Sequence, residues 1–390
     1  MPTLAFDPFS LQAHEDPYPM YAKLRALGRP AFDEQLGMWT VATHADVIDV
    51  LRDWETFSSA QGEDIDDSAS YFPPGNLLEH DPPDHRFLRS VIQGPFSPKA
   101  IRARLEPYVQ AEADRLVAQM AALERADFAM EFAWSLPTSV VMEFLGLPRE
   151  DREQLTRWQM QFMERVPGDR RPPSSAMAAA GHLAEYFAAV IDDRRRSPRE
   201  DLLTFIANGE AGGAPIGDAA VGMAHVIFAA AIDTTASFLN NTVYLLDRHR
   251  DQRRWLLENP DSLEPALEEC LRFESPVQNA KRTVTKAVEL NGSSMPQGAT
   301  VAVLFGSANR DEHRYEEADR FDLQRPQQRT LAFGEGIHHC LGAPLARMEG
   351  RVAIGALLRV MPDYELAETP ERFRSHVVRG FSRLVIAPAG

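Results

Sequence analysis

Ten residues, 333–342, have the sequence FGEGIHHCLG and carry the chain's most specific chemical signal. Their glycines let the backbone approach another group closely and leave amide donors free, while Cys340 offers a soft thiolate. Because a helical pattern begins at Cys340, its sulfur is expected to face the donor end of a helix, which favours the thiolate. An isolated cysteine is more often a small buried apolar residue. In this loop, however, Cys340 suits an iron ligand, and no further Cys or His stands at zinc-site spacing.

A second polar pair interrupts an apolar stretch. In AHVIFAAAIDTTASFL, Asp233 and Thr234 follow seven apolar residues of a helical pattern. Burying a carboxyl and a hydroxyl is costly unless they are used. Thr234 can turn its hydroxyl toward the carbonyl of Ala230, four residues earlier. The pair is a candidate functional pair, although neighbouring side chains could equally satisfy it.

Four more side chains are candidates for holding an anionic group. His85 and Arg89 are four residues apart in DPPDHRFLR, so a helix directs both the same way, which suits them to bind carboxylates. Arg282 follows the segment PVQNAK, and His338 stands two residues before Cys340. Taken singly, each is more often a surface cation. Together with Cys340, they predict one site.

The pattern F-G-x-G-x-H-x-C-x-G of residues 333–342 resembles the heme-binding loop of the cytochrome P450 family at every fixed position. The segment DPYPMYAKLRALG is similar to the first helix of bacterial members, so the resemblance runs from about residue 16 to the end. It implies that Cys340 is the axial ligand of the iron in heme b, iron protoporphyrin IX. It also implies that the heme propionates contact His85, Arg89, Arg282 and His338.

Residues 230–234, AAIDT, match the family pattern A-[AG]-x-[DE]-T. The resemblance implies that Asp233 and Thr234 deliver two protons to dioxygen at the iron. Ala231 stands where glycine is more common, which implies a tighter oxygen groove.

Glu269 and Arg272, in EECLRF, resemble the family's structural E-x-x-R pair. Three residues apart, they share one helical face. A buried charge pair of this kind usually needs a further partner. Arg320, in ADRF, is the expected third member.

The resemblance implies a monooxygenase that inserts one atom of dioxygen into a C–H bond. The chain has no G-x-G-x-x-G opening a strand–helix unit and no cysteine cluster, so its electrons are expected from another protein. The implied partner is a [2Fe–2S] ferredoxin with its ferredoxin reductase, docking on the cysteine side of the heme. Its candidate contacts, which could equally be a solvated basic face, are Arg86, Arg102, Arg104 and Arg347.

The substrate pocket is implied to be compact and largely apolar, which suits a small aromatic, aromatic ether or terpenoid-like molecule. Hydroxylation and O-demethylation are the expected reactions. The implied lining residues are Tyr71 and Phe72 in the 59–75 loop, Val226, Ala230, the 277–279 turn and Phe381. Three alternatives stay open: a peroxide-driven peroxygenase, a non-catalytic heme sensor or carrier, and a heme-free helical interaction protein.

Helical periodicity dominates the elements that must position these residues, which predicts a mainly α fold with small β-sheets. The resemblance adds a triangular-prism-like body with the heme between the long central helix and the cysteine loop. The predicted helices are 17–28, 44–52, 84–93, 98–122, 127–145, 151–165, 174–196, 218–248, 260–273 and 340–361. The predicted strands are 38–42, 282–284, 288–290, 301–304 and 384–388.

Composition narrows the class of protein. The 390 residues include 41 Lys and Arg against 57 Asp and Glu, a net charge of −16, which argues against nucleic acid or anionic membrane as a partner. Two cysteines are too few for a disulfide framework. The first residues show no signal peptide or membrane anchor, which predicts a soluble, cytoplasmic protein. With no repeat or long linker, residues 1–390 are predicted to form a single domain.

Overall fold

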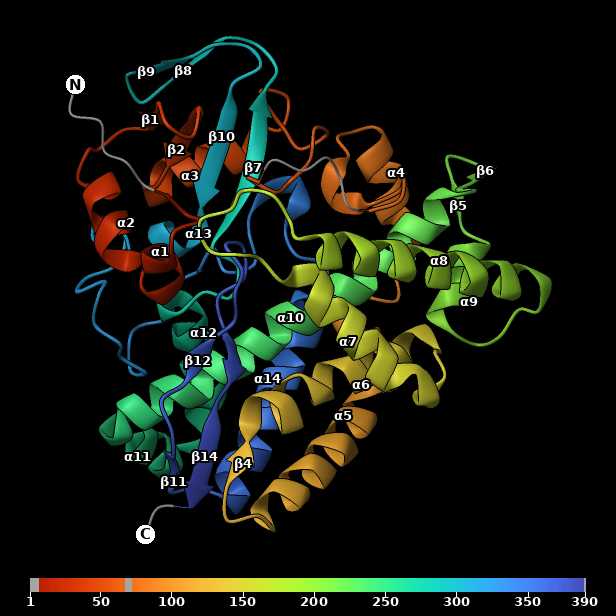
Figure 1. Ribbon diagram of the computed structural model, residues 1–390, viewed down its shortest axis with the longest axis vertical. Coiled ribbons are helices and arrows are strands. Elements are labelled where there is room, and N and C mark those ends of the chain that lie inside the picture. The colour runs from red at the N-terminus through yellow and green to blue at the C-terminus, as the bar shows by residue number, and fades with distance from the viewer. Residues whose placement is uncertain (1–6, 67–71, 389–390) are drawn as a thin grey trace.

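The computed structural model describes residues 7–66 and 72–388, and it is mainly helical with small sheets (Figure 1). The long helix α10, Ala219–Arg248, runs through the middle of the molecule and packs against α6, Ser135–Leu145, and α14, Ala343–Val360. Helix α5, Pro98–Ala121, lies along α14. Apolar side chains of these four helices form about half of the main core. The predicted fold class is confirmed.

The other helices surround this core. The α-helices are α1 (Leu11–Glu15), α2 (Tyr18–Arg25), α3 (His44–Arg52), α4 (Asp84–Ile92), α7 (Arg152–Met163), α8 (Ser174–Arg196), α9 (Leu202–Ala207), α11 (Arg250–Glu258), α12 (Leu263–Phe273) and α13 (Phe305–Ala308). The short 3-10 or π turns are η1 (Leu77–Glu79), η2 (Ala129–Ala133), η3 (Arg149–Asp151), η4 (Pro260–Ser262) and η5 (Gly336–His338).

The largest sheet has five strands in the order β1-β2-β10-β7-β3, and only the β2–β10 pair is parallel. A second sheet has the order β11-β14-β4, and three hairpin-like pairs complete the set. The strands are β1 (Ala31–Asp33), β2 (Met38–Val41), β3 (Phe57–Ser58), β4 (Ala126–Asp127), β5 (Glu210–Ala211), β6 (Ala214–Pro215), β7 (Asn279–Val284), β8 (Val288–Leu290), β9 (Ser293–Met295), β10 (Thr300–Leu304), β11 (Tyr364–Leu366), β12 (Glu371–Arg372), β13 (Phe381–Arg383) and β14 (Val385–Pro388).

One predicted helix, 127–145, is wrong in its first part. The backbone of Ala126 and Asp127 instead pairs with the C-terminal strand β14, and the N–H of Phe128 donates to the carbonyl of Leu384. These hydrogen bonds to a segment far along the chain override the local helical periodicity. The helix α6 therefore begins only after the π turn η2.

Two other expectations about the elements differ from the structure. The helix predicted from 340 begins at Ala343, so Cys340 precedes it. The helix predicted from 260 consists of the turn η4 followed by α12. The helices α3 and α8 have the predicted bounds. The expectation that residues 1–390 form a single domain stays a prediction.

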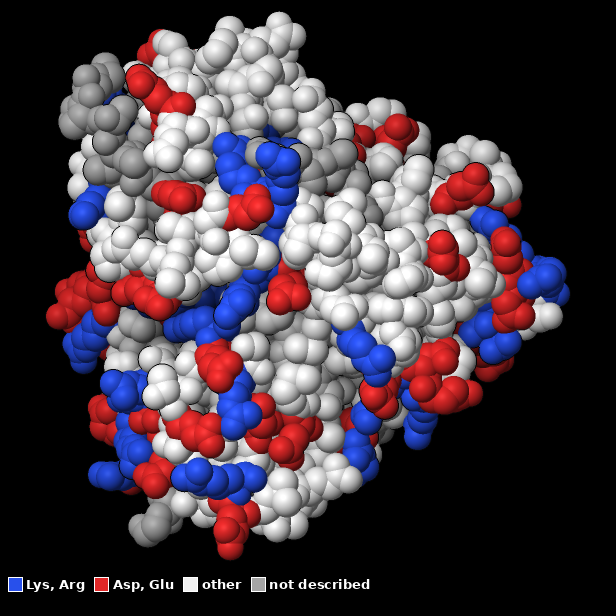
Figure 2. Space-filling model, viewed as in Figure 1, with Lys and Arg blue, Asp and Glu red and all other residues white. Residues whose placement is uncertain are grey.

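The composition of α10 is apolar enough to cross a membrane, but 72% of its most apolar 18-residue window is buried inside the fold, as in the core helix of a soluble protein. Positive and negative side chains are interspersed on the lower part of the face shown in Figure 2.

Candidate active site

Cys340 lies in a tight loop between η5 and the first turn of α14. Gly336 adopts φ +71, in the left-handed region that favours glycine. A Cβ atom there would lie 2.3 Å from the carbonyl oxygen of Leu51, so a side chain does not fit. The N–H of Cys340 donates to the carbonyl of Phe333 at 2.9 Å. These contacts fix the position of the sulfur.

The side chain of Cys340 is exposed because it borders a cavity, and it lies among the residues that line this cavity. Burial raises the pKa of its thiol, and the backbone of Gly342 and the guanidinium of Arg89 lower it by less. The predicted stabilisation by helix donors is therefore present but smaller than the cost of burial. Coordination of a metal ion deprotonates a thiol in such a place.

The cavity has a volume of about 380 Å³ and extends from Cys340 to the Thr234 side of α10. Its lining is mostly apolar. The predicted lining residues Phe72, Val226 and Ala230 and the turn containing Val277 and Asn279 all belong to it. Tyr71 lies outside the described residues.

Phe381 does not line this cavity, so that prediction is wrong. Its ring packs against Tyr244, with the centroids 4.9 Å apart, and Arg372 covers it at 4.1 Å. Residues beside β13 reach the cavity instead, through Val377 and Val378.

A cluster of cationic and imidazole side chains lines one end of the cavity: His85, Arg89, Arg282 and His338. The rings of His85 and His338 are 4.5 Å apart. Burial, together with the neighbouring Arg282, His85 and Arg89, lowers the pKa of His338 to about 2. Within the described residues, no carboxylate forms an ion pair with Arg89 or with the buried Arg282. Buried cations need a counter-ion, so this set fits the two carboxylates of a heme.

On the opposite wall, the hydroxyl of Thr234 donates to the carbonyl of Ala230 at 2.7 Å, the contact expected from the sequence. Asp233 beside it is 3% exposed, and Gln159 of α7 approaches its carboxylate. Burial raises the pKa of Asp233 to about 7, although hydrogen bonds from backbone groups and from Gln159 oppose the rise. The carboxyl can therefore hold or release a proton near neutral pH.

A second acid, Glu349 of α14, also lines the cavity. Its side chain is buried, and its Oε2 atom has no hydrogen-bond partner. Burial raises the pKa of Glu349 to about 8. Sequence reasoning missed this residue because a glutamate nine positions after Cys340 belongs to no spacing that we considered.

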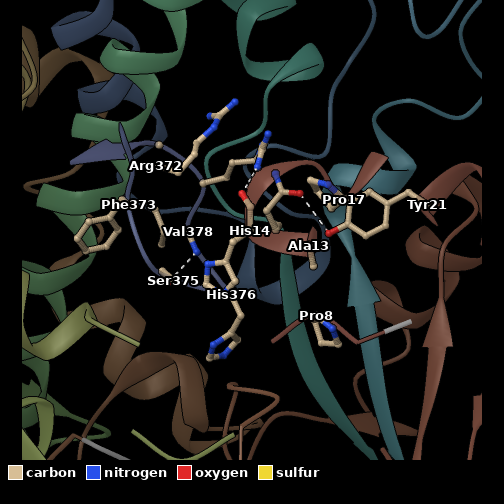
Figure 3. Close-up of a pocket in the computed structure, with 13 residues that line it drawn as sticks. Pro8, Ala13, His14, Pro17, Tyr21, Arg372, Phe373, Ser375, His376 and Val378 are labelled. Atoms are coloured by element: carbon tan, nitrogen blue, oxygen red, sulfur yellow. Dashed lines mark hydrogen bonds between the residues drawn. The ribbon is translucent and has the colours of Figure 1, made fainter. Parts of the chain in front are cut away.

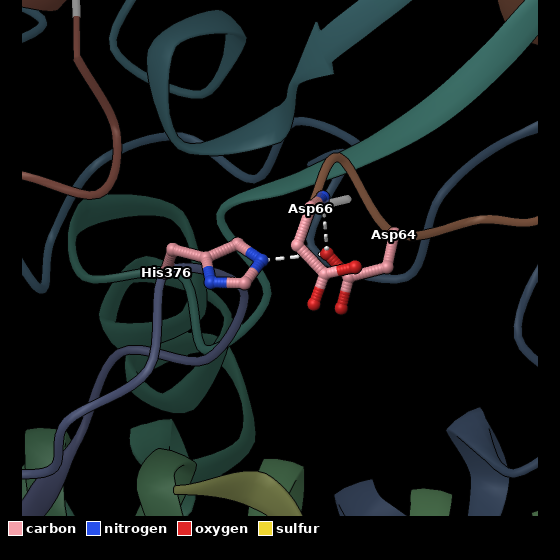
Figure 4. Close-up of side chains that lie close together, drawn as sticks. All are labelled: Asp64, Asp66 and His376. Atoms are coloured by element: carbon pink, nitrogen blue, oxygen red, sulfur yellow. Dashed lines mark hydrogen bonds and ion pairs between the residues drawn. The ribbon is translucent and has the colours of Figure 1, made fainter. Parts of the chain in front are cut away.

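A buried polar cluster joins three segments beside the cavity (Figure 4). The Nε2 atom of His376 lies 2.6 Å from the Oδ1 atom of Asp64, whose neighbour Asp66 completes the acidic pair. Arg165, just beyond α7, lies 3.6 Å from Asp64 and 3.4 Å from Asp66. Its guanidinium neutralises the carboxylates, so the cluster is an ion-pair network and does not need a metal ion.

A second, smaller cavity of about 20 Å³ lies on the other side of His376 (Figure 3). Its lining includes His14, Tyr21 and Arg372. The Nδ1 atoms of His14 and His376 have no hydrogen-bond partner. The volume is enough for one water molecule, which would satisfy these buried nitrogen atoms.

The structural E-x-x-R pair is present, but its third partner is not Arg320. Arg272 binds Glu269 through two hydrogen bonds of 2.7 and 2.8 Å. The guanidinium that joins them belongs to Arg325, 3.3 Å from Glu269. Arg320 instead lies on the surface and pairs with Glu317. The two arginines are five positions apart, and the sequence pattern alone did not tell which one turns toward Glu269.

Comparison with known proteins identifies the family. Residues 175–367 match the family model described as Cytochrome P450. The cytochrome P450 monooxygenase PikC of Streptomyces venezuelae is 36% identical over 391 residues, which cover 95% of this chain and 91% of PikC. The chain belongs to the cytochrome P450 family. The biotin biosynthesis cytochrome P450 of Bacillus subtilis strain 168 is 30% identical over 384 residues, with 95% of this chain and 96% of that relative covered.

Solved P450 structures have the same fold. The structure of a mutant of P450 EryK in complex with erythromycin B matches with a TM-score of 0.89 at 32% identity. The match covers 98% of this chain and 98% of the EryK chain. CYP109E1 from Bacillus megaterium, in complex with testosterone, has a TM-score of 0.89 at 28% identity, covering 97% of this chain and 99% of its own. This P450 is therefore a monooxygenase with heme as its cofactor, as the resemblance implied.

Proposed function

We propose that this P450 oxidises a small, largely apolar molecule, an aromatic compound, an aromatic ether or a terpenoid-like compound, by hydroxylation or O-demethylation. The observation that carries the proposal is that Cys340 and the Asp233–Thr234 pair line the same apolar cavity. A thiolate ligand on one side and a proton-bearing pair on the other suit oxygen activation at a heme.

Cys340 is the proposed axial ligand of the heme iron, and the proposed propionate partners are His85, Arg89, Arg282 and His338. Heme with a thiolate ligand supplies the activation of dioxygen. The chain's part is to hold that group in a dry cavity. Neither Arg282 nor Arg89 forms an ion pair with a described carboxylate, and Glu63 and Asp81 act on Arg282 only from beyond ion-pair distance, which supports this assignment.

Asp233 and Thr234 are the proposed proton carriers. Because burial raises the pKa of Asp233 to about 7, its carboxyl holds a proton part of the time at neutral pH. The hydroxyl of Thr234 is both donor and acceptor, and it can rotate from the carbonyl of Ala230 toward the cavity.

The substrate class is proposed from the shape of the cavity wall. The rings of Phe72 and Phe162 both line the cavity and meet edge to face, with centroids 5.5 Å apart. Val226 and Ala230 of α10 add small apolar surface. Two relatives bind testosterone and erythromycin B in their crystal structures. Here the two phenyl rings take up space at the cavity wall, which supports a smaller, flat or compact substrate.

A [2Fe–2S] ferredoxin with its reductase is the proposed electron donor, in the cytoplasm. Of the four candidate arginines, Arg86 and Arg104 are exposed and form no ion pair among the residues described. Arg102 lies 3.7 Å from Glu106, and Arg347 forms a two-bond contact with Glu268. Arg86 and Arg104 are therefore the freer candidates for contact with an acidic partner.

The proposal is tested with heme-loaded protein, a surrogate [2Fe–2S] ferredoxin, its reductase, and a panel of aromatic ethers and terpenoids. We expect one oxygenated product per two electrons from at least one compound. Dioxygen use without any such product across the panel would overturn the substrate proposal. Turnover supported by hydrogen peroxide and not by ferredoxin would identify a peroxygenase.

The role of the polar pair is tested by Thr234→Ala. We expect electron use to continue while product formation falls by about 100-fold, the size of a lost general acid. Thr242→Ala is the matched control, because Thr242 makes the same hydroxyl-to-carbonyl contact on α10, at 2.9 Å, away from the cavity. Equal loss of product in both variants would show that only the helix backbone matters. Unchanged product in Thr234→Ala would overturn the proposed role of Thr234. A heme carrier or sensor would be indicated only if the unaltered protein formed no product.

A further inference from the structure

Gln159 of α7 is the side chain that approaches the Asp233 carboxyl from a neighbouring element. Its Nε2 atom lies 3.4 Å from the Oδ1 atom of Asp233 and 3.4 Å from the carbonyl oxygen of Ala229. Gln159 is fully buried, with an exposed fraction of 0%. Both contacts are long for hydrogen bonds, so the amide holds the carboxyl without a strong charge interaction.

The orientation of this amide follows from its neighbours. Amide nitrogen and oxygen are assigned from their partners, and both partners here are oxygen acceptors. The nitrogen therefore faces Asp233 and Ala229, and the Oε1 atom of Gln159 is left without a hydrogen-bond partner. A buried glutamine that gives up one of its partners to face a carboxyl is unusual for a residue that serves packing alone.

No charged side chain shares this role. Residues that can carry charge on α10, on the elements packed against it and just beyond α7 include His225, Glu143, Arg165, His182, Tyr186, Arg272 and Glu349. Within the described part of the chain, none of them forms an ion pair or hydrogen bond with Asp233, and none shifts its pKa. Most are engaged elsewhere: Arg165 with Asp64 and Asp66, Tyr186 with Asp151, and Arg272 with Glu269.

We propose that Gln159 is a positioning residue whose neutral amide holds the Asp233 carboxyl in place without fixing its charge. The inference deepens the proposed function and rests on Asp233 as a proton carrier. A lysine or arginine at this position would hold the carboxyl ionised, and an apolar residue would leave it unheld. With the amide present, burial raises the pKa of Asp233 and hydrogen bonds from Gln159 and from backbone groups partly oppose the rise, so both protonation states remain accessible.

The test replaces Gln159 and follows the protonation of Asp233 directly. In heme-loaded protein, infrared difference spectroscopy over a pH series records the carbonyl stretch of buried protonated carboxyls. The part of the signal that Asp233→Asn removes belongs to Asp233, which separates it from Glu349. We expect its midpoint near pH 7 in the unaltered chain.

Gln159→Lys is expected to lower the midpoint by about 1–3 pH units, because an opposite charge within a few ångströms favours the ionised form. Gln159→Met, which has a similar length but no donor, is expected to raise it. Gln161→Lys is the matched control, since Gln161 is exposed on the same helix, and it is expected to leave the midpoint unchanged. If Gln159→Lys does not fold and bind heme, Gln159→Met decides the question alone.

Coupled turnover gives the second measurement. We expect the pH at which product per electron is highest to shift in the same direction as the infrared midpoint. An unchanged midpoint in both Gln159 variants would overturn the inference, even if Asp233→Asn abolished product. A different outcome is that the midpoints shift in the Gln159 variants while Asp233→Asn still forms product in full. This outcome would overturn the proposed role of Asp233 as a proton carrier and leave the positioning by Gln159 standing.

Discussion

Two buried acids of this P450 have opposite surroundings. Glu274, at the end of α12, is contacted by Arg310, Arg372 and Arg379, and their charges hold its pKa at about 2 in spite of its burial. Asp233, on α10, is as deeply buried but has only the amide of Gln159, and its pKa is raised to about 7. For these two acids, burial alone therefore does not decide the charge, whereas direct ion pairs with arginine do.

The same division separates the other buried acids. Glu269 is paired with Arg272 and Arg325, away from the cavity. Glu349 lines the cavity and has no cation among its described contacts, and its pKa is raised to about 8. Arginines are plentiful in this chain, so their absence around Asp233 and Glu349 is a feature of the site. Among the acids that line the cavity, Asp233 and Glu349 have raised pKa values and can take up a proton, whereas His376 and Arg165 lower the pKa of Asp64.

The largest expected effect follows from removing the charge of Glu274. Glu274→Gln leaves three buried guanidinium groups without their carboxylate, which should lower the free energy of unfolding by about 3–5 kcal/mol at pH 7. A carboxyl with a lowered pKa stabilises the fold above pH 4.5, and this contribution is lost as the pH falls toward 2. Denaturant titrations of heme-loaded protein at pH 7 and pH 4 check the prediction, and a loss that is equal at both pH values would contradict it.

Removing the charge of Asp233 should have the opposite sign. A carboxyl with a raised pKa favours the fold while it is protonated, and this contribution is lost as the pH rises through about 7. Asp233→Asn should therefore be more stable than the unaltered chain at pH 9, by about 1–3 kcal/mol, and similar to it at pH 4. The same denaturant titrations measure this. Destabilisation at pH 9 would mean that Asp233 is a structural acid like Glu274.

A smaller effect is expected at the third member of the Glu269 cluster. Arg325→Gln removes one of two guanidinium partners, while Arg272 keeps its two hydrogen bonds to Glu269. The free energy of unfolding should fall by about 1 kcal/mol, measured in the same way.

The smallest effect is expected at Arg320, the partner that the sequence suggested. Arg320→Gln removes only surface ion pairs, with Glu317 and at 3.9 Å with Asp322, so no measurable change in stability is expected. If Arg320→Gln costs more than Arg325→Gln, the assignment of the inward-facing arginine is wrong.

The sequence was sufficient for the features that are written in consecutive residues. The cysteine loop, the Asp233–Thr234 pair, the contact between Thr234 and Ala230, and the bounds of α3 and α8 all follow from local spacing. Each depends on glycines, on helical period or on a contact four residues away, which are local physical constraints.

Features built from distant residues could not be predicted in this way. Gln159 lies 74 positions before Asp233, and a lone glutamine in a helix has no distinguishing pattern. His376 and Asp64 are 312 positions apart. The pairing of Asp127 with β14 likewise joins a segment in the first third of the chain to the C-terminal strand, against the local helical periodicity. In each case the partner is chosen by packing of the whole fold, which no local pattern records.

The close approach of Gly336 to the carbonyl of Leu51 has a consequence for how this enzyme can diversify. Any larger residue there has to push either α3 or the sulfur of Cys340 out of position, so the wall that carries the thiolate tolerates little variation. Adaptation to new compounds is then left to the part of the cavity wall formed by Phe72 and Phe162, whose rings can be exchanged without disturbing Cys340, the proposed iron ligand.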